Sequence, residues 1–199
     1  TKYTTMERIL LNDQLNVKLQ KLPEIVLIKK EQIAGFHYEL INNFKNDLKI
    51  SKIVLTNDRP DIVVKYIKEC QNCHIVRKSD LLIIQNKNID NNYVNVYVKH
   101  KNILERKNFP KYEFIMSSKS LDDIINSLNK GDISNTLLTR DTYLFYKKYY
   151  PNIKIKEKLS EVYLSWIYET DDGSLHNNIK IYFVKKNTKE FLKNLEQKY

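Results

Sequence analysis

The stretch KGDISNTLLTRDTYLFYKKYYPNI, residues 130–153, decides how this sequence is interpreted, because it contains the end of one predicted helix and the whole of the next. Just before it, Ser120 opens a capping-box pattern, in which a hydroxyl satisfies the first backbone N–H groups of a helix. The apolar residues that follow share one helical face: Leu121, Ile124, Ile125 and Leu128. Gly131 stands where a helix end favours a left-handed residue. We predict a helix over residues 120–131 and an aromatic-rich helix over Thr142–Tyr150, which Pro151 ends.

Working outward, strand patterns alternate with helix patterns along the chain. Valines at 94, 96 and 98 follow strict strand alternation, and apolar residues from Phe36 to Phe44 recur at helical spacing. We predict strands at Ile25–Ile28, Ile50–Leu55, Leu81–Ile84, Val94–Val98 and Leu159–Tyr168. We predict helices at Phe36–Asn46 and Asp61–Glu69, and closing helices within Leu175–Tyr199. The order of elements indicates an α/β fold.

The composition is that of a globular chain, with 199 residues and 42% hydrophobic side chains. The net charge of +10 would suit a phosphate-rich partner, but the lysines are scattered along the whole chain, so we expect solvated faces and no specific nucleic-acid partner. No run reaches the roughly 18 apolar residues of a membrane span. Residues 1–5 contain no signal-peptide core, and we expect membrane contact only through an anchor trimmed from this sequence.

Three blocks carry a resemblance to a known family: Gly35–Leu40, residues 130–153, and Asp171–Tyr199. They resemble the type-2 periplasmic solute-binding proteins (bacterial extracellular solute-binding protein family 3). The most similar pattern is that of the non-catalytic binding domain of membrane-bound lytic transglycosylase F. All three glycines of the chain lie in these blocks, as expected where tight turns and helix ends restrict the backbone.

The resemblance implies a two-lobed periplasmic-binding-protein type II fold with a shortened first lobe. Lobe one would comprise residues 1–92 and 162–199, and lobe two residues 93–161, with hinge strands near 89–95 and 160–168. The ligand expected between the lobes is an amino acid, a small peptide or a muropeptide from the cell wall. The expected location is the bacterial envelope, either periplasmic or associated with the outer membrane. A catalytic domain after Tyr199, or another envelope protein, would be the protein partner.

The same resemblance suggests the residues that contact a ligand. Amino-acid-binding members hold the ligand's ammonium group with an Asp at the position of Thr139, and Arg140 and Asp141 lie beside it. In the family, the Arg that binds the ligand's carboxylate lies in a stretch that this chain lacks between Cys73 and Asn88. Arg77 or Arg59 would take the place of that Arg. Phe36 and Trp166 are the expected aromatic contacts.

These departures leave an alternative function, because the residues that usually bind the ligand are changed or lost. A degenerate solute-binding fold would then serve as a protein-interaction module of the envelope.

Cys70-Gln71-Asn72-Cys73-His74 has the C-x-x-C-H spacing, which allows three interpretations. We expect a disulfide between Cys70 and Cys73 that replaces a missing turn glycine, since these are the only two cysteines. Free thiols and a haem-carrying domain, with His74 as the iron ligand, are the alternatives. Zinc would need two more ligands, and the other histidines have no supporting spacing, so we expect no metal and no cofactor.

The paired acids do not indicate catalysis. Asp122-Asp123 opens the helix predicted after Ser120, where negative charge stabilises the helix dipole, and Asp171-Asp172 precedes Gly173 in a predicted turn. Glu161 lacks the surrounding residues that a transglycosylase glutamate requires. With no nucleophile triad or phosphate-binding glycine loop, we expect no enzymatic activity in this chain alone.

Overall fold

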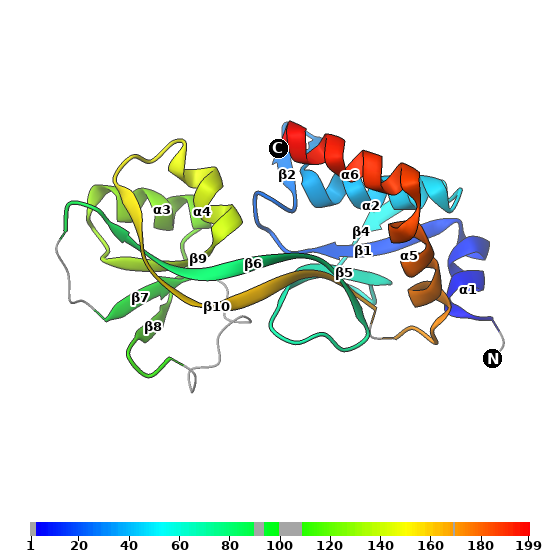
Figure 1. Cartoon of the computed structure of the whole chain (residues 1–199), viewed down its shortest axis with the longest axis horizontal. Coiled ribbons are helices and arrows are strands. Elements are labelled where there is room, and N and C mark those ends of the chain that lie inside the picture. The colour runs from blue at the N-terminus through cyan, green and yellow to red at the C-terminus, as the bar shows by residue number, and fades with distance from the viewer. Residues whose placement is uncertain (1–2, 90–93, 100–108, 169) are drawn as a thin grey trace. The chain divides into compact units, whose positions relative to one another are not determined.

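The computed structural model describes residues 3–89, 94–99, 109–168 and 170–199 and divides into two compact units (Figure 1). Unit 1 comprises Thr1–Arg77 and Leu164–Tyr199, and unit 2 comprises Lys78–Tyr163. The boundaries fall inside two long strands, β6 (Cys73–Asn86) and β10 (Ile153–Ile167), so each of these strands contributes to both units. The hinge expected near 89–95 falls largely on residues 90–93, which lie outside the described residues.

Unit 1 contains a parallel sheet in which β1 lies between β4 and β5. Its strands are β1 (Gln14–Leu19), β2 (Leu27–Lys29), β3 (Gln32–Ala34), β4 (Lys52–Leu55) and β5 (Ile62–Ile67). Its helices are α1 (Thr5–Asn12), α2 (Phe36–Asp47), α5 (Ser174–Val184) and α6 (Lys186–Lys198). The core centres on Trp166, which contacts Phe44 and Phe183 with ring centroids 5.4 and 4.9 Å away.

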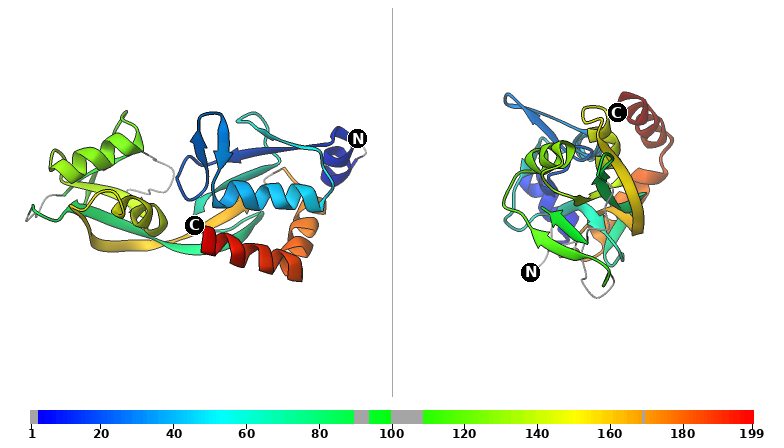
Figure 2. Two further views of the ribbon diagram at one scale, coloured as in Figure 1. Left: turned by 90° about the horizontal axis from the view of Figure 1, so that it is seen from above. Right: turned by 90° about the vertical axis from the view of Figure 1, so that its left-hand side faces the viewer.

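The predicted helix after Phe36 is confirmed as α2, with Phe36, Leu40 and Phe44 on its buried face. It begins at Gly35, whose φ of +114° is open to glycine but strained for other residues. The C-terminal helix α6 runs beside α2 (Figures 1 and 2) and fixes this start, because the Gly35 amide donates to the Tyr199 hydroxyl at 3.1 Å. Lys198 also pairs with Glu39 at 2.7 Å.

The prediction of a helix over Asp61–Glu69 is wrong, because residues 62–67 form strand β5. Buried and half-buried side chains alternate along β5, and the β-branched residues Ile62, Val63 and Val64 favour that extended conformation. Strands β4 and β5 lie on either side of β1 and run parallel to it, and only residues 56–61 connect them. A connection between parallel strands usually needs a dozen or more residues. A short connection of this kind leaves no room for a helix.

The buried carboxylate of Asp61 fixes this connection to β1. It accepts a hydrogen bond from the Asn16 amide and pairs with Arg8, both at 2.8 Å. Where the resemblance placed the shortened stretch, between Cys73 and Asn88, the chain instead forms most of β6.

The predicted strand Ile25–Ile28 is correct only at its end, since β2 covers Leu27–Lys29. Ile25 lies in the preceding turn, where its amide donates to the Leu22 carbonyl at 2.9 Å. The polar turn predicted after this strand is confirmed. It joins β2 to β3 through Lys30 and Glu31, which both have positive φ, as the tight turns of β-hairpins require.

Unit 2 contains β7 (Asn95–Val98), β8 (Glu113–Met116), α3 (Leu121–Lys130), β9 (Asn135–Thr139) and α4 (Arg140–Lys147). β9 lies between β6 and β7, and β8 pairs in parallel with the outer side of β7. The predicted α3 is confirmed, with the Ser120 hydroxyl accepting from the Asp123 amide and Gly131 left-handed at φ +86°. Helix α4 starts two residues before the predicted one, because the Thr139 hydroxyl caps it by accepting from the Thr142 amide.

None of the described helices is both long and apolar enough to span a lipid bilayer.

Candidate functional site

Each unit has a cavity at the carboxyl ends of two parallel strands. In open α/β sheets, ligands bind beyond these strand ends, where loops and helix N-termini present polar groups. In unit 1 the strands are β1 and β4, and in unit 2 they are β7 and β8. These two cavities are therefore candidate binding sites.

The unit 1 cavity has a volume of about 420 Å³. Its walls come from the end of β1, the residues that follow β4, and the β2–β3 hairpin with the turn before it. The lining residues are Val17, Lys18, Leu19, Lys21, Val26, Ile28, Leu55, Thr56 and Asn57. Five of these side chains are apolar and four are polar or charged, so the cavity offers a ligand both apolar contact and polar groups that can orient it.

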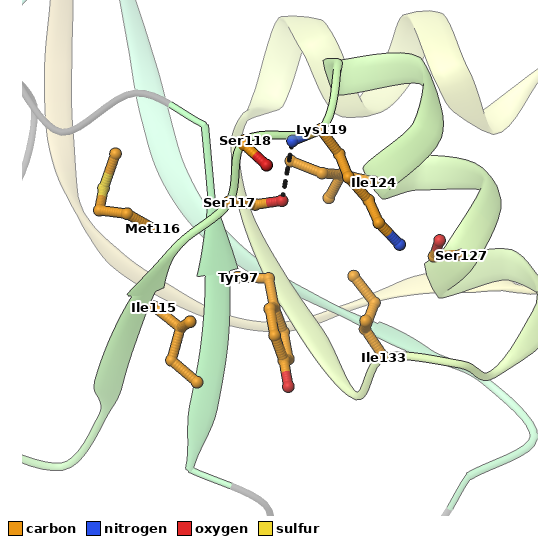
Figure 3. A pocket seen from close by; sticks show the side chains of 9 residues that line it. All are labelled: Tyr97, Ile115, Met116, Ser117, Ser118, Lys119, Ile124, Ser127 and Ile133. Atoms are coloured by element: carbon orange, nitrogen blue, oxygen red, sulfur yellow. Dashed lines mark hydrogen bonds between the residues drawn. The ribbon is translucent and has the colours of Figure 1, made fainter.

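The unit 2 cavity measures about 250 Å³ and lies between the ends of β7 and β8 and the start of α3 (Figure 3). Its lining residues are Tyr97, Ile115, Met116, Ser117, Ser118, Lys119, Ile124, Ser127 and Ile133. The loop after β8 is held by the Ser117 hydroxyl, which accepts from the Lys119 amide at 3.2 Å. Hydroxyl and amine groups thus face an otherwise apolar wall.

Three residues predicted to contact the ligand lie together at the N-terminus of α4. Thr139 is buried as the helix cap, and Asp141 follows in the first turn. Arg140 donates from Nε to Asp80 at 2.8 Å, and Lys158 pairs with the other oxygen of that carboxylate at 3.1 Å. Hydrogen bonds from Arg140 and then Lys158 lower the pKa of Asp80. None of the three residues lines the unit 2 cavity.

The other predicted contacts lie in unit 1. Arg77 and Phe36 are brought together, with the guanidinium carbon 5.6 Å from the ring centroid, and Arg59 lies in the β4–β5 connection. Trp166 is fully buried in the aromatic core and has no surface to offer a ligand, so we leave it out of the proposed site. Like the α4 group, Arg77 and Phe36 are not in the cavity lining.

His37 is a buried polar residue that sequence reasoning missed. It is 1% exposed, and neither ring nitrogen has a hydrogen-bond partner among the described residues. Burial first, and then the charge of Arg77, lower the pKa of His37 to about 3. The imidazole is therefore neutral at physiological pH.

The cavity residues were also missed, although Thr56 and Asn57 directly follow the strand that was predicted at Ile50–Leu55. Polar residues directly after a strand would have been the signal, as with Thr56 and Asn57 after β4. Neither β1 nor β8 was predicted, so the rule could not be applied to Lys18, Lys21 or Lys119.

Cys70 and Cys73 form a disulfide, the expected one of the three interpretations. Haem attachment through thioether bonds would need both sulfurs, which are joined to each other in this structure. His74 is half-buried and stacks on Phe183 with ring centroids 4.2 Å apart. No group of three potential metal ligands occurs in the described part of the chain, and His100 lies outside that part.

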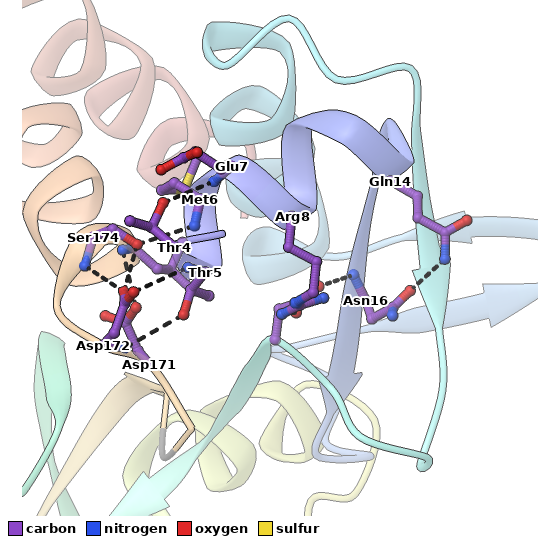
Figure 4. A network of polar contacts seen from close by, with 12 residues as sticks. Thr4, Thr5, Met6, Glu7, Arg8, Gln14, Asn16, Asp171, Asp172 and Ser174 are labelled. Carbon is purple, nitrogen blue, oxygen red and sulfur yellow. Dashed lines mark hydrogen bonds and ion pairs between the residues drawn. The ribbon is translucent and has the colours of Figure 1, made fainter. Parts of the chain in front are cut away.

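The acid pairs have structural roles, as expected. Asp122 accepts a hydrogen bond from the Tyr146 hydroxyl at 2.5 Å. Asp172 links the starts of α5 and α1, accepting from the Ser174 hydroxyl at 2.7 Å and from the Thr5 amide at 3.3 Å (Figure 4). Hydrogen bonds from Ser174, chiefly, lower the pKa of Asp172 to about 2.

Comparisons with known proteins give matches at the level of structure. No family model and no curated protein sequence matches the chain. The structure of Tv2483 bound to L-arginine aligns with a TM-score of 0.81 and 12% identity, over 96% of this chain and 92% of that one. A P235GK mutant of ArgBP from T. maritima aligns with a TM-score of 0.76 and 14% identity, over 98% of both chains. The GluR0 ligand-binding core in complex with L-glutamate aligns with a TM-score of 0.69 and 13% identity, over 92% of this chain and 97% of that one.

The high TM-scores establish the fold, whereas sequence identities this low do not identify the ligand. The alignments run over nearly the whole of each chain, so they include both units and both cavities. The chain has the periplasmic-binding-protein type II fold, and its structural neighbours are amino-acid-binding solute-binding proteins.

Proposed function

We propose that this chain is a ligand-binding domain for a small molecule of amino-acid size, and that the cavity of unit 1 and the cavity of unit 2 are its candidate binding sites. The observation that carries the proposal is the full-length likeness to structures whose ligands are L-arginine and L-glutamate. Cavities at the carboxyl ends of the strands in both units support it. The domain would bind and sense its ligand without transforming it.

We also propose a periplasmic location and a regulatory role. The resemblance of residues 130–153 and 171–199 to the binding domain of lytic transglycosylase F supports a cell-wall fragment, such as a short muropeptide, as one class of ligand. A catalytic or envelope protein would respond to the bound state. The cystine at Cys70–Cys73 fits an oxidising compartment.

The test is a ligand screen by thermal shift followed by isothermal titration. The panel contains the twenty amino acids, short peptides and muropeptide fragments. A ligand present at 100 times its Kd stabilises the folded chain by about 2.7 kcal/mol, which is a readily measured shift. If no compound shifts the melting temperature or gives heat on titration, the proposed function is wrong.

A matched pair of variants locates the binding. Asn57 is exposed and lines the unit 1 cavity, whereas Asn177 is exposed on α5 and lies outside the lining. Asn57→Ala should weaken binding of any ligand found in the screen, and Asn177→Ala should leave it unchanged. Equal affinities in both variants would exclude the unit 1 cavity as part of the site.

A further inference from the structure

We infer that the ligand is an organic anion whose carboxylates are its main binding groups, and that an ammonium group contributes little to binding. This inference rests on the proposed function and names the chemical class of its ligand. It is carried by the charges that line the two cavities, because a buried or half-buried ligand charge needs an opposite charge beside it.

In the unit 1 cavity, Lys18 and Lys21 are the only charged residues among the described ones that form its lining. Both are exposed, and neither forms an ion pair with another described residue. Asp58 follows Asn57 in sequence but does not belong to the lining. Two uncompensated amines beside an apolar wall attract carboxylates and repel a guanidinium or ammonium group.

The unit 2 cavity repeats this arrangement with one amine. Within the part of the chain that the structure describes, Lys119 is its only charged lining residue, and Ser117, Ser118 and Ser127 add hydroxyl groups (Figure 3). Asp122 and Asp123 come soon after Lys119 in sequence, but neither lines the cavity. Among the described residues, then, no carboxylate faces either cavity.

The strands of unit 2 contain an acid that would otherwise suit an ammonium group, but it is already engaged. Each oxygen of Asp80 faces a cation, Arg140 on one side and Lys158 on the other. Thr139 beside it is uncharged and caps α4 with its hydroxyl. A carboxylate that already faces two cations of the protein attracts a cationic group of a ligand only weakly.

The experiment is a titration with four ligands of similar size that differ in charge: L-glutamate, glutarate, L-glutamine and L-arginine. Glutarate keeps both carboxylates of glutamate and lacks the ammonium group. We expect glutarate and L-glutamate to bind with affinities within about threefold of each other, and L-glutamine and L-arginine to bind at least tenfold more weakly. Raising the salt concentration should weaken the two anions selectively.

Lysine variants test the assigned residues. Lys18→Gln combined with Lys21→Gln should weaken glutarate binding at least tenfold, whereas Lys29→Gln, on the hairpin outside the lining, should leave it unchanged. Circular dichroism of each variant checks that the fold is retained.

The outcomes separate the inference from the function on which it rests. If L-arginine or L-glutamine binds as tightly as glutarate, or if the double variant binds like Lys29→Gln, the inference is overturned while a ligand-binding function stands. If none of the four ligands binds but a neutral or cationic compound of the wider screen does, the inference is again overturned and the function stands. If no compound of the whole panel binds, both are overturned.

Discussion

Replacing Gly35 by alanine should destabilise unit 1 far more than the same change at Gly173. Both glycines have positive φ, +114° at Gly35 and +100° at Gly173, which is unfavourable for a residue with a Cβ atom. A Cβ at position 35 would lie 2.8 Å from both the carbonyl oxygen of Ile25 and the Cα of Val26. A Cβ at position 173 would meet no atom within 4 Å. The pair therefore separates the strain of positive φ from the steric clash.

The magnitudes follow from these two contributions. Positive φ in an alanine costs about 1–2 kcal/mol, which is the whole loss expected for Gly173→Ala. The clash at Gly35 involves backbone atoms that cannot rotate away, and overpacking of this kind adds about 1–3 kcal/mol. We expect Gly35→Ala to lose about 2–5 kcal/mol, with a fall in Tm of about 2–4 °C for each kcal/mol in a chain of this size.

Urea unfolding followed by tryptophan fluorescence measures this difference. Trp166 is the only tryptophan, is fully buried and lies in unit 1 with both glycines, so its emission reports the unit that is perturbed. The midpoint should fall in the order wild type, Gly173→Ala, Gly35→Ala, with an unchanged slope. Equal midpoints for the two variants would refute the close approach of Gly35 to the Ile25–Val26 backbone.

Three further changes test other features of unit 1. His37 has a folded-state pKa of about 3 against 6.5 when unfolded, so between these values the unfolded chain binds more protons, and stability is lost as the pH is lowered. Relative to His37→Phe, wild type should lose about 1.4 kcal/mol for each unit by which the pH falls from 6 to 4, measured in urea titrations. A parallel dependence in both proteins would exclude the buried neutral imidazole. Asp61→Asn places an amide donor against Arg8 or against the Asn16 amide, so it should lower the free energy of unfolding by about 1.5–3 kcal/mol. Arg8→Ala should lower it by less than about 1 kcal/mol, because the Arg8 side chain is half-exposed. A larger loss for Arg8→Ala than for Asp61→Asn in urea unfolding would contradict the roles assigned to the two residues. Reduction of the Cys70–Cys73 disulfide should lower the free energy of unfolding by about 2 kcal/mol, because the bond closes only a short loop in the unfolded chain. Urea unfolding with and without reductant measures this loss in wild type. A variant with both Cys70→Ser and Cys73→Ser should not respond to reductant.

The sequence alone determined the elements whose signals lie within a few residues. Helix α3 followed from its cap at Ser120, its apolar face and Gly131, all of which act between neighbouring turns. Helix α2 and strand β7 followed from apolar periodicity. The type II fold was predicted from the resemblance of the blocks around the three glycines to type-2 solute-binding proteins.

The tertiary structure decided everything that depends on neighbours distant in sequence. Residues 62–67 form a strand because they pair in parallel with β1 and because the short connection of residues 56–61 leads to them directly from β4. Neither the pairing nor the path of the connection is encoded in a local sequence pattern. Lys18, Lys21 and Asn57 line one cavity because β1 and β4 pair in parallel, so that their carboxyl ends lie at the same edge of the sheet. Trp166, a plausible ligand contact by sequence, proved to be the centre of the unit 1 core. Burial and strand pairing are properties of the assembled sheet, so they could be read only from the folded chain.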